Sequence, residues 1–245
     1  MFLRPLEYLF KQEKLAVLLL NHCERWPPLW FRLWNNSVYR VCTDGGANLL
    51  QQYVKEKNIK LPHMICGDFD SVTAENLQFF NSKGVTVQAT QDQDFTDMCK
   101  ALRIIAEEIN TGRIKAESVI VLGGLSGRID HTLSSFNSLL RFRTICDRPI
   151  FINDGFNLLT VLTEGITEIQ FNGYLSKLTR ITGFIPFCQK KTIVTSNGFK
   201  WNLKDVPLEF GGCISSSNEI VGDAVSINTS APLIFTLELS SDSVQ

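Results

Sequence analysis

The sequence lacks the features that mark membrane-spanning, secreted and nucleic-acid-binding proteins. Its longest early apolar run, LAVLLL at 15–20, is far too short to span a bilayer. Four charged side chains between Glu7 and Lys14 precede that run, which argues against a secretory signal. The formal net charge is −1 and no basic run is present, so neither a nucleic-acid backbone nor a membrane surface is expected as a partner.

Cysteine pairs at redox or metal-binding spacing are also missing. The chain has seven cysteines, an odd number, and no C-x-x-C pair. Cys42, Cys66 and Cys99 stand within or beside apolar segments. We therefore expect buried, reduced thiols and a cytoplasmic location, and no disulfide framework. There is no internal repeat, and the absence of a G-x-x-x-x-G-K-[ST] sequence excludes a P-loop enzyme.

The chain does have two halves with different periodicity. Up to about residue 150, short apolar runs alternate with stretches of helical spacing, such as FTDMCKALRIIAEEIN at 95–110. This alternation predicts βαβ units around a mainly parallel sheet, with strands at 15–20, 38–42, 63–66, 85–89, 118–124 and 149–153. Later β-prone runs, punctuated by Gly, Asn and Pro, predict antiparallel strands. The expected fold is a Rossmann-like αβα domain at 1–154, followed by a β-sandwich domain at 155–245.

Acidic and glycine-rich motifs follow four of the predicted strands. They are TDGGAN at 43–48, GDFDS at 67–71, QDFTD at 93–97 and GGLSGRID at 123–130. Because the carboxyl ends of parallel strands meet at one edge of a sheet, the four loops are expected to border one crevice. Asp68 and Asp70, two residues apart in extended backbone, would point to the same side. With Asp94 or Asp97 they would form a cluster that needs a cation, and the all-oxygen ligands favour Mg²⁺.

The same loops carry groups that suit phosphate. Glycine turns at 45–46 and 123–127 would let backbone N–H groups approach phosphate oxygens, and Arg128 could clamp one of them. A structural role is open for each residue taken alone, because Asp94 and Thr96 would also serve as helix N-caps. Because such motifs occur in all four loops, a functional site at this edge of the predicted sheet is favoured over four separate structural roles.

The motifs resemble, in order, those of the thiamine pyrophosphokinase family. DGGAN, GDFDS, DQDFTD, GGLSGRIDH and, in the β half, SSSNE carry this resemblance, which covers nearly the whole chain. It implies an α/β nucleotide domain, a β-sandwich domain that binds thiamine, and a requirement for Mg²⁺. It also implies transfer of the pyrophosphoryl group of ATP to thiamine, giving thiamine diphosphate and AMP, by a homodimer with its active site at the subunit interface.

The resemblance further implies roles for individual residues. The metal-holding carboxylates would be Asp68, Asp70 and Asp97, and with Asp44 and Arg128 they form the expected catalytic set. Nucleotide and phosphate contacts are expected at Gln93, Asp94, Thr96, Arg128, Asp130 and Asn48, of which Asn48 would also brace its loop. Thiamine contacts are expected at Ser216, Ser217 and Asn218, whereas Trp201 would either stack on thiamine or belong to the core. Phe95 departs from the family pattern, because vertebrate members have His there.

Three other interpretations stay open from the sequence. DFDSVT at 68–73 matches the D-x-D-x-[TV] loop of aspartate-nucleophile phosphatases, in which Asp68 would be phosphorylated. That chemistry also needs a downstream Lys and a late acidic pair, and VGDAVSIN at 221–228 supplies only Asp223. A D-x-D sequence also holds nucleotide-sugar diphosphates in metal-dependent glycosyltransferases. The third alternative is a protein that binds thiamine or nucleotide without catalysis.

Overall fold

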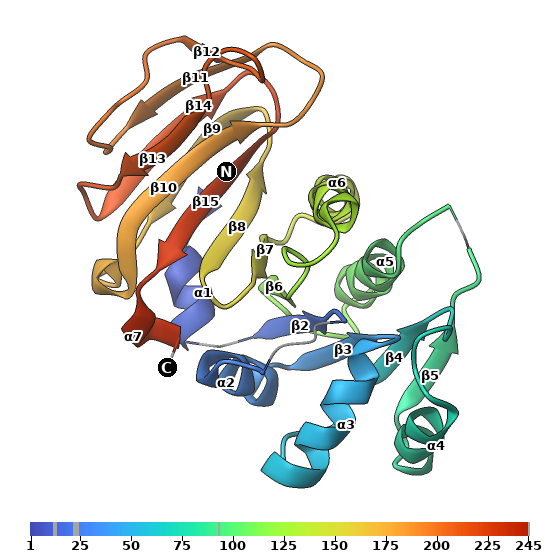
Figure 1. Ribbon diagram of the computed structural model, residues 1–245. Coiled ribbons are helices and arrows are strands. Elements are labelled where there is room, and N and C mark those ends of the chain that lie inside the picture. Colours follow the sequence, from blue (N-terminus) through green and yellow to red (C-terminus); the bar gives the residue numbers. More distant parts are fainter. Residues whose placement is uncertain (12–13, 22–24, 93, 245) are drawn as a thin grey trace. The chain divides into compact units, whose positions relative to one another are not determined.

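The computed structural model describes residues 1–11, 14–21, 25–92 and 94–244, which form two compact units. One unit runs from Gln12 to Gly155, and the other combines Met1–Lys11 with Phe156–Gln245. Figure 1 shows the helices and strands of both units. Among the described residues, no helix combines the length and the apolar character that crossing a membrane requires.

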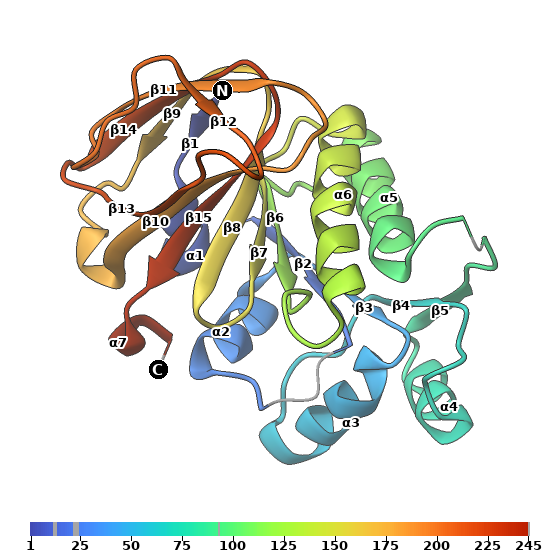
Figure 2. The same ribbon diagram turned by 45° about the horizontal axis from the view of Figure 1, so that its top comes forward.

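The first unit is an αβα layer structure with a parallel sheet in the order β7-β6-β2-β3-β4-β5. Its strands are β2 Leu15–Leu19, β3 Tyr39–Thr43, β4 Met64–Gly67, β5 Thr86–Ala89, β6 Ser118–Leu122 and β7 Ile150–Asn153. Its helices are α2 Pro28–Asn36, α3 Gly46–Lys57, α4 Ala74–Ser82, α5 Asp97–Asn110 and α6 Ile129–Ile145. In Figures 1 and 2, α5 and α6 cover one face of the sheet, and α2, α3 and α4 cover the other. The predicted Rossmann-like fold is confirmed.

Burial along the strands explains why the sequence forms this sheet. Every residue of β2 and β6 is buried, because helices cover both faces of the sheet centre. The edge strand β5 is mostly exposed. The order of strand addition reverses between β2 and β6, which lie side by side. At such a reversal the loops diverge beyond the carboxyl ends of the strands and leave room for a ligand.

The second unit is built from two mainly antiparallel sheets. Their strand orders within this unit are β1-β9-β14-β11-β12 and β13-β10-β15-β8. The strands are β1 Phe2–Leu3, β8 Asn157–Leu162, β9 Gly165–Gln170, β10 Leu178–Pro186, β11 Thr192–Asn197, β12 Val206–Leu208, β13 Ser215–Glu219, β14 Ala224–Thr229 and β15 Leu233–Leu239. Short helical segments are α1 Pro5–Lys11, η1 Leu175–Lys177 and α7 Ser241–Val244. The predicted antiparallel β-rich C-terminal part is confirmed.

Residues 1–11 belong to the β-rich unit, although the sequence pattern assigned them to the α/β part. The physical reason is strand pairing: β1 pairs in parallel with β9, with Leu3 opposite Ile169. The side chain of Leu3 is buried. A two-residue strand has no periodicity that a sequence pattern can reveal, so this pairing shows only in three dimensions.

Candidate active site

A cavity of about 510 Å³ lies at the carboxyl edge of the parallel sheet, within the α/β unit. Five loops contribute to its wall, namely those that follow β2, β3, β4, β5 and β6. Representative lining residues, in that order, are Asn21, Asp44, Asp68, Asp97 and Arg128. The structure therefore brings side chains from all four predicted motifs to one cavity.

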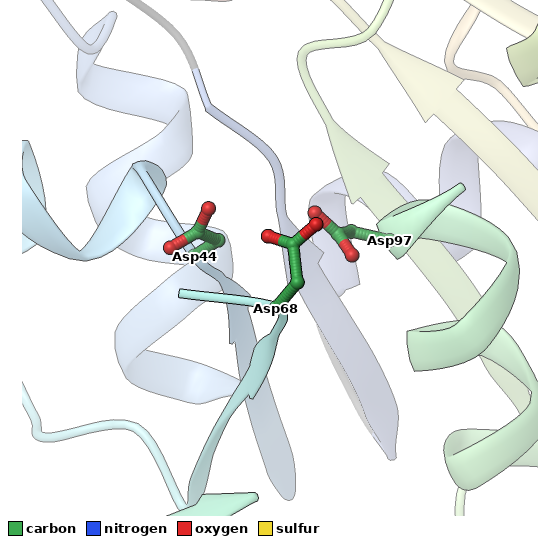
Figure 3. Close-up of side chains that lie close together, drawn as sticks. All are labelled: Asp44, Asp68 and Asp97. Carbon is green, nitrogen blue, oxygen red and sulfur yellow. The ribbon is translucent and has the colours of Figure 1, made fainter. Parts of the chain in front are cut away.

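Three carboxylates form the centre of this cavity. Asp44 follows β3, Asp68 follows β4, and Asp97 is the first residue of α5. Each can offer one oxygen such that the three oxygens lie within 4.8 Å of one another. Figure 3 shows the three side chains turned toward a common space. We refer to Asp44, Asp68 and Asp97 as the acidic triad.

Asp44 is the buried member of the triad, with 3% of its surface exposed. Its two carboxylate oxygens accept hydrogen bonds from the backbone N–H groups of Val72 at 3.0 Å and Ser71 at 3.1 Å. Burial raises the pKa of Asp44 above its ordinary value, although these two amides oppose the rise. Gly67 is required beside it, because an added Cβ would lie 2.7 Å from the Cβ of Asp44. Asp44 thus fixes the GDFDS loop as well as facing the cavity.

Asp70 lines the cavity but is not part of the triad. The third carboxylate beside Asp68 and Asp97 is that of Asp44, whereas the sequence predicted that of Asp70. The expected extended backbone between Asp68 and Asp70 is wrong. β4 ends at Gly67, and Phe69 has a left-handed φ of 65°, which breaks the alternation of a strand. The Ser71 hydroxyl donates to Oδ1 of Asp70 at 2.6 Å. This bond, with the Asp44 carboxyl group nearby, lowers the pKa of Asp70.

The cavity combines negative side chains with positive helix ends. Its wall includes four aspartates, whereas Arg128 is its one arginine or lysine among the described residues. The N-terminal ends of α3, α5 and α6 border the cavity, and helix N-termini favour phosphate oxygens. A polyphosphate could therefore enter only together with cations that offset the aspartates.

Arg128 stands immediately before α6, and 72% of its side chain is exposed, so its guanidinium is accessible to a ligand. Its guanidinium pairs with Asp130, from Nη2 to Oδ2 at 2.5 Å. The hydrogen bond from the Arg128 guanidinium lowers the pKa of Asp130. Asp130 does not line the cavity. The pair places a planar donor group at the rim of the cavity, where phosphate would enter.

The remaining predicted residues of the α/β unit have mainly structural contacts. Thr96 lines the cavity and caps α5, because its hydroxyl accepts a bond from the N–H of Cys99 at 3.4 Å. Asn48 lies outside the cavity wall and braces the GDFDS loop, donating to the carbonyl of Ser71 at 3.0 Å. Asp94 is exposed, and its N–H donates to Asp92. Gln93 lies outside the described residues.

Phe95, the departure from the family pattern, packs against two arginines. The guanidinium carbon of Arg103 lies 3.7 Å from the centre of its ring, and that of Arg141 lies 4.5 Å away. Arg103 belongs to α5 and Arg141 to α6. The cation–π contacts therefore link the two helices whose first turns border the cavity. A histidine that became protonated here would lose this attraction.

In the β-rich unit, Asn218 and Trp201 are joined by hydrogen bonds. Asn218 is 2% exposed, and its side chain donates to the carbonyl of Trp201 at 2.8 Å. Its Oδ1 accepts from the N–H groups of Trp201 and Glu219. Trp201 itself is exposed, so it is not a core residue. Ser216 is exposed, and Ser217, also exposed, has a left-handed φ of 59°.

Lys100, which contacts the acidic triad through Asp97, is a residue that sequence reasoning missed. It is buried on α5, and its Nζ lies 2.8 Å from Oδ1 of Asp97. A signal was present in the sequence: Lys100 stands three residues after Asp97 and is followed by apolar Ala101 and Leu102. A lysine on the apolar side of a helix needs a carboxylate partner, and the i, i+3 spacing provides one.

The triad fits a magnesium ion by its donor chemistry. All three ligands are carboxylates, and Mg²⁺ prefers oxygen ligands in octahedral geometry. Ligand oxygens around Mg²⁺ lie about 3 Å apart when adjacent and about 4.2 Å apart when opposite. Small rotations of the side chains would bring oxygens that lie within 4.8 Å to these separations. The exposure of Asp68 leaves space for water and phosphate ligands.

Comparison with known proteins agrees with this geometry. The family described as "Thiamin pyrophosphokinase, catalytic domain" matches residues 30–151, and "Thiamin pyrophosphokinase, vitamin B1 binding domain" matches residues 167–234. A Caenorhabditis elegans protein, "Thiamin pyrophosphokinase 1", is 39% identical over 208 residues, which cover 84% of this chain and 82% of the relative. The chain belongs to the thiamine pyrophosphokinase family. The first match contains the acidic triad, and the second contains Trp201 and Asn218.

Other members of the thiamine pyrophosphokinase family agree in sequence or in fold. "Thiamine pyrophosphokinase 1" of Oryza sativa subsp. japonica is 30% identical over 236 residues, covering 91% of this chain and 87% of the relative. The crystal structure of the yeast enzyme has a TM-score of 0.86 at 24% identity, covering all of this chain and 92% of the other. That from Candida albicans has a TM-score of 0.85 at 22% identity, covering 98% and 92%. Because both identities are below 25%, these two structures support the fold of this chain and nothing further.

Proposed function

We propose that this chain transfers the pyrophosphoryl group of ATP to the hydroxyl group of thiamine. The products are thiamine diphosphate and AMP. The observation that carries this proposal is the acidic triad, which lies in a cavity formed mostly by the segment that matches the family's catalytic domain. A second match, to the vitamin B1 binding domain, supports thiamine as the acceptor.

Magnesium is the proposed metal, and Asp44, Asp68 and Asp97 would hold it, with Asp70 beside them. When bound, Mg²⁺ neutralises phosphate oxygens and so makes the β-phosphorus easier for a hydroxyl oxygen to attack. The chain itself supplies alignment. The helix N-termini at the cavity and the guanidinium of Arg128 would orient the phosphate groups, as phosphoryl transfer requires.

Proton removal from the thiamine hydroxyl falls to a carboxylate of the cavity. Asp70 and Asp97 are the two candidates, and both line the wall. The lowered pKa of Asp70 makes it a weaker base, whereas Asp97 has one oxygen held by Lys100. Since an alcohol is a weak acid, proton transfer would accompany attack on phosphorus rather than precede it.

The thiamine-recognising surface is proposed at Ser216, Ser217 and Trp201. The exposed indole of Trp201 can stack on a cationic ring. Asn218 would act through Trp201, because its amide group is already bonded to the backbone of that residue. A homodimer with its active site at the subunit interface, and a cytoplasmic location, are further parts of the proposal that rest on the family resemblance.

Incubation of the purified protein with ATP, Mg²⁺ and thiamine tests the function. We expect AMP and thiamine diphosphate in equal amounts, and no AMP above background when thiamine is omitted. Absence of thiamine-dependent AMP would contradict the proposal. Trapping a phosphoaspartate at Asp68 would instead favour the phosphatase alternative, and preference for a nucleotide sugar over ATP would favour a glycosyltransferase. Binding of both substrates without any product would indicate a non-catalytic protein.

A further inference from the structure

Among the residues that the structure describes, Lys100 is the one buried basic side chain, and it lies beside the acidic triad. Only 7% of its side chain is exposed. Its Nζ lies 2.8 Å from Oδ1 of Asp97 and donates to the carbonyl oxygen of Thr90 at 2.9 Å. Burying an ammonium group is costly, and a single ion pair seldom offsets that cost with net stability. Net stability alone therefore does not explain why a lysine is buried beside the triad.

The second contact of Lys100 shows what it connects. Thr90 follows β5, and its own N–H donates to the carbonyl of Gly67, the last residue of β4, at 2.8 Å. Lys100 therefore ties the first turn of α5 to the ends of two neighbouring strands. Asp68 comes directly after β4, and Asp97 begins α5. The relative position of these two triad members depends on this connection.

The charge balance of the acidic triad also points to a role for Lys100. Three ionised carboxylates carry a charge of −3, and among the described residues Lys100 is the one basic side chain that forms an ion pair with any of them. With Lys100 the group carries −2, the charge that a single divalent cation neutralises. Without Lys100, Asp97 would be repelled by Asp44 and Asp68. Its side chain, 29% exposed, has room to turn away from them.

We propose that Lys100 is a positioning residue for the metal site. Its ammonium group holds one oxygen of Asp97, so that the carboxylate stays turned toward Asp44 and Asp68, as Figure 3 shows for the triad. Lys100 acts through Asp97 and contacts neither phosphate nor thiamine. This inference rests on the proposed function, because it assumes that the triad binds a divalent cation.

Binding of Mn²⁺ to the nucleotide-free protein tests the proposal without turnover. The free ion is measured by electron paramagnetic resonance for the wild type, Lys100→Met and Lys115→Met. We expect Lys100→Met to weaken binding about 10- to 100-fold, the usual cost of losing a residue that orients a metal ligand. Lys115 is exposed, so Lys115→Met removes the same charge and should bind Mn²⁺ as the wild type does. Steady-state kinetics should show a lower kcat with little change in KM for thiamine.

A double-mutant cycle separates positioning from a general effect on folding. In an Asp97→Asn background, Lys100→Met should change Mn²⁺ affinity by less than about twofold, because the residue through which it acts is already altered. Equal losses in both backgrounds, or normal Mn²⁺ binding by Lys100→Met, would overturn the proposal. If Lys100→Met does not fold, Lys100→Gln takes its place in the same cycle. A wild-type protein that binds no Mn²⁺ would contradict the metal site itself, which is a different result.

Discussion

The four aspartates of the cavity have the same side chain but different surroundings. Asp44 is buried and bonded to two backbone amides, and Asp97 is held by Lys100. Asp68 is exposed, and its Oδ1 accepts a long bond, 3.4 Å, from the N–H of Asp70. Removing each carboxylate should therefore have a different result. Loss of Asp44 would loosen the loop after β4, whereas loss of Asp68 would affect ligand binding with little effect on the fold.

The raised pKa of Asp44 predicts pH-dependent metal binding. Burial places this pKa above that of an unfolded chain, so the metal-free folded protein binds a proton more readily than the unfolded protein does. Its contribution to stability is thus fully present below the unfolded pKa and is lost as pH rises through the folded pKa. A metal needs the ionised form, so Mn²⁺ affinity should rise with pH across the same range.

Mn²⁺ titrations at stepwise acidic pH, with the wild type and Asp44→Asn, check this expectation. The variant should bind Mn²⁺ more weakly overall, but its affinity should depend less steeply on pH. An identical pH dependence in both proteins would show that Asp44 does not determine it. Thermal unfolding without metal over the same pH range gives the accompanying change in stability.

Asp70→Asn should reduce turnover while leaving the fold intact. Asp70 has an exposed side chain at the cavity and accepts a bond from Ser71. An amide group keeps that acceptor but removes the charge and the ability to accept a proton. We expect kcat to fall about 10- to 100-fold or more, as for groups that support a metal site. Circular dichroism should show an unchanged fold, and unchanged turnover would remove Asp70 from the catalytic set.

At the scale of elements, the start of α5 combines several roles in a few residues. Thr96 caps the helix, Asp97 joins the triad, and Lys100 holds Asp97. Phe95, just before the cap, connects α5 with α6 through Arg103 and Arg141. The helical interpretation of this segment is confirmed, and its functional role stays a prediction that Asp97 in the acidic triad supports. Thr96 and Asp97 occupy adjacent positions at the N-terminal end of α5, where capping oxygens and carboxylates are both favoured.

The loop before β12 gives a second element-scale prediction. The buried amide of Asn218 fixes the backbone at Trp201, so Asn218→Ala should release that loop and leave the cavity of the α/β unit untouched. KM for thiamine should rise by about tenfold or more, since one or two hydrogen bonds of about 1 kcal/mol each hold the loop. KM for ATP should stay near the wild-type value. Trp201→Ala is the matched variant and should have a similar effect. Equal increases in both KM values would contradict the assignment.

The alternation of apolar runs and helical stretches was sufficient to predict the parallel sheet, because βαβ units have a long and regular pattern. The predicted strands at 15–20 and 63–66 differ from β2 and β4 by a residue at their ends. β12 escaped prediction because it has only three residues, and the six-residue β8 was missed although it is longer than β2 and β4. The gathering of Asp44, Asp68 and Asp97 followed from parallel topology. The position of Asp70 could not be predicted, since it depends on the left-handed φ of Phe69, which a bulky residue rarely adopts.

At the scale of the whole molecule, the family resemblance predicts a homodimer. Exposed apolar side chains at the start of α6, Ile129 at 71% and Leu133 at 58%, lie one turn apart beside Arg128 and would suit burial in an interface. Analytical ultracentrifugation should give about twice the mass of one chain at micromolar concentration. Leu133→Glu should shift the distribution toward monomer, whereas Lys115→Glu at an exposed position should not. A monomeric wild type at these concentrations would contradict the prediction.

The pairing of β1 with β9 has a consequence for biosynthesis. Leu3 leaves the ribosome before the Gln12–Gly155 segment, but its partner Ile169 follows only after that entire segment has emerged. At ordinary elongation rates this delay is about 10 to 30 seconds. The nascent chain must therefore carry β1 without its partner strand while the intervening unit is synthesised.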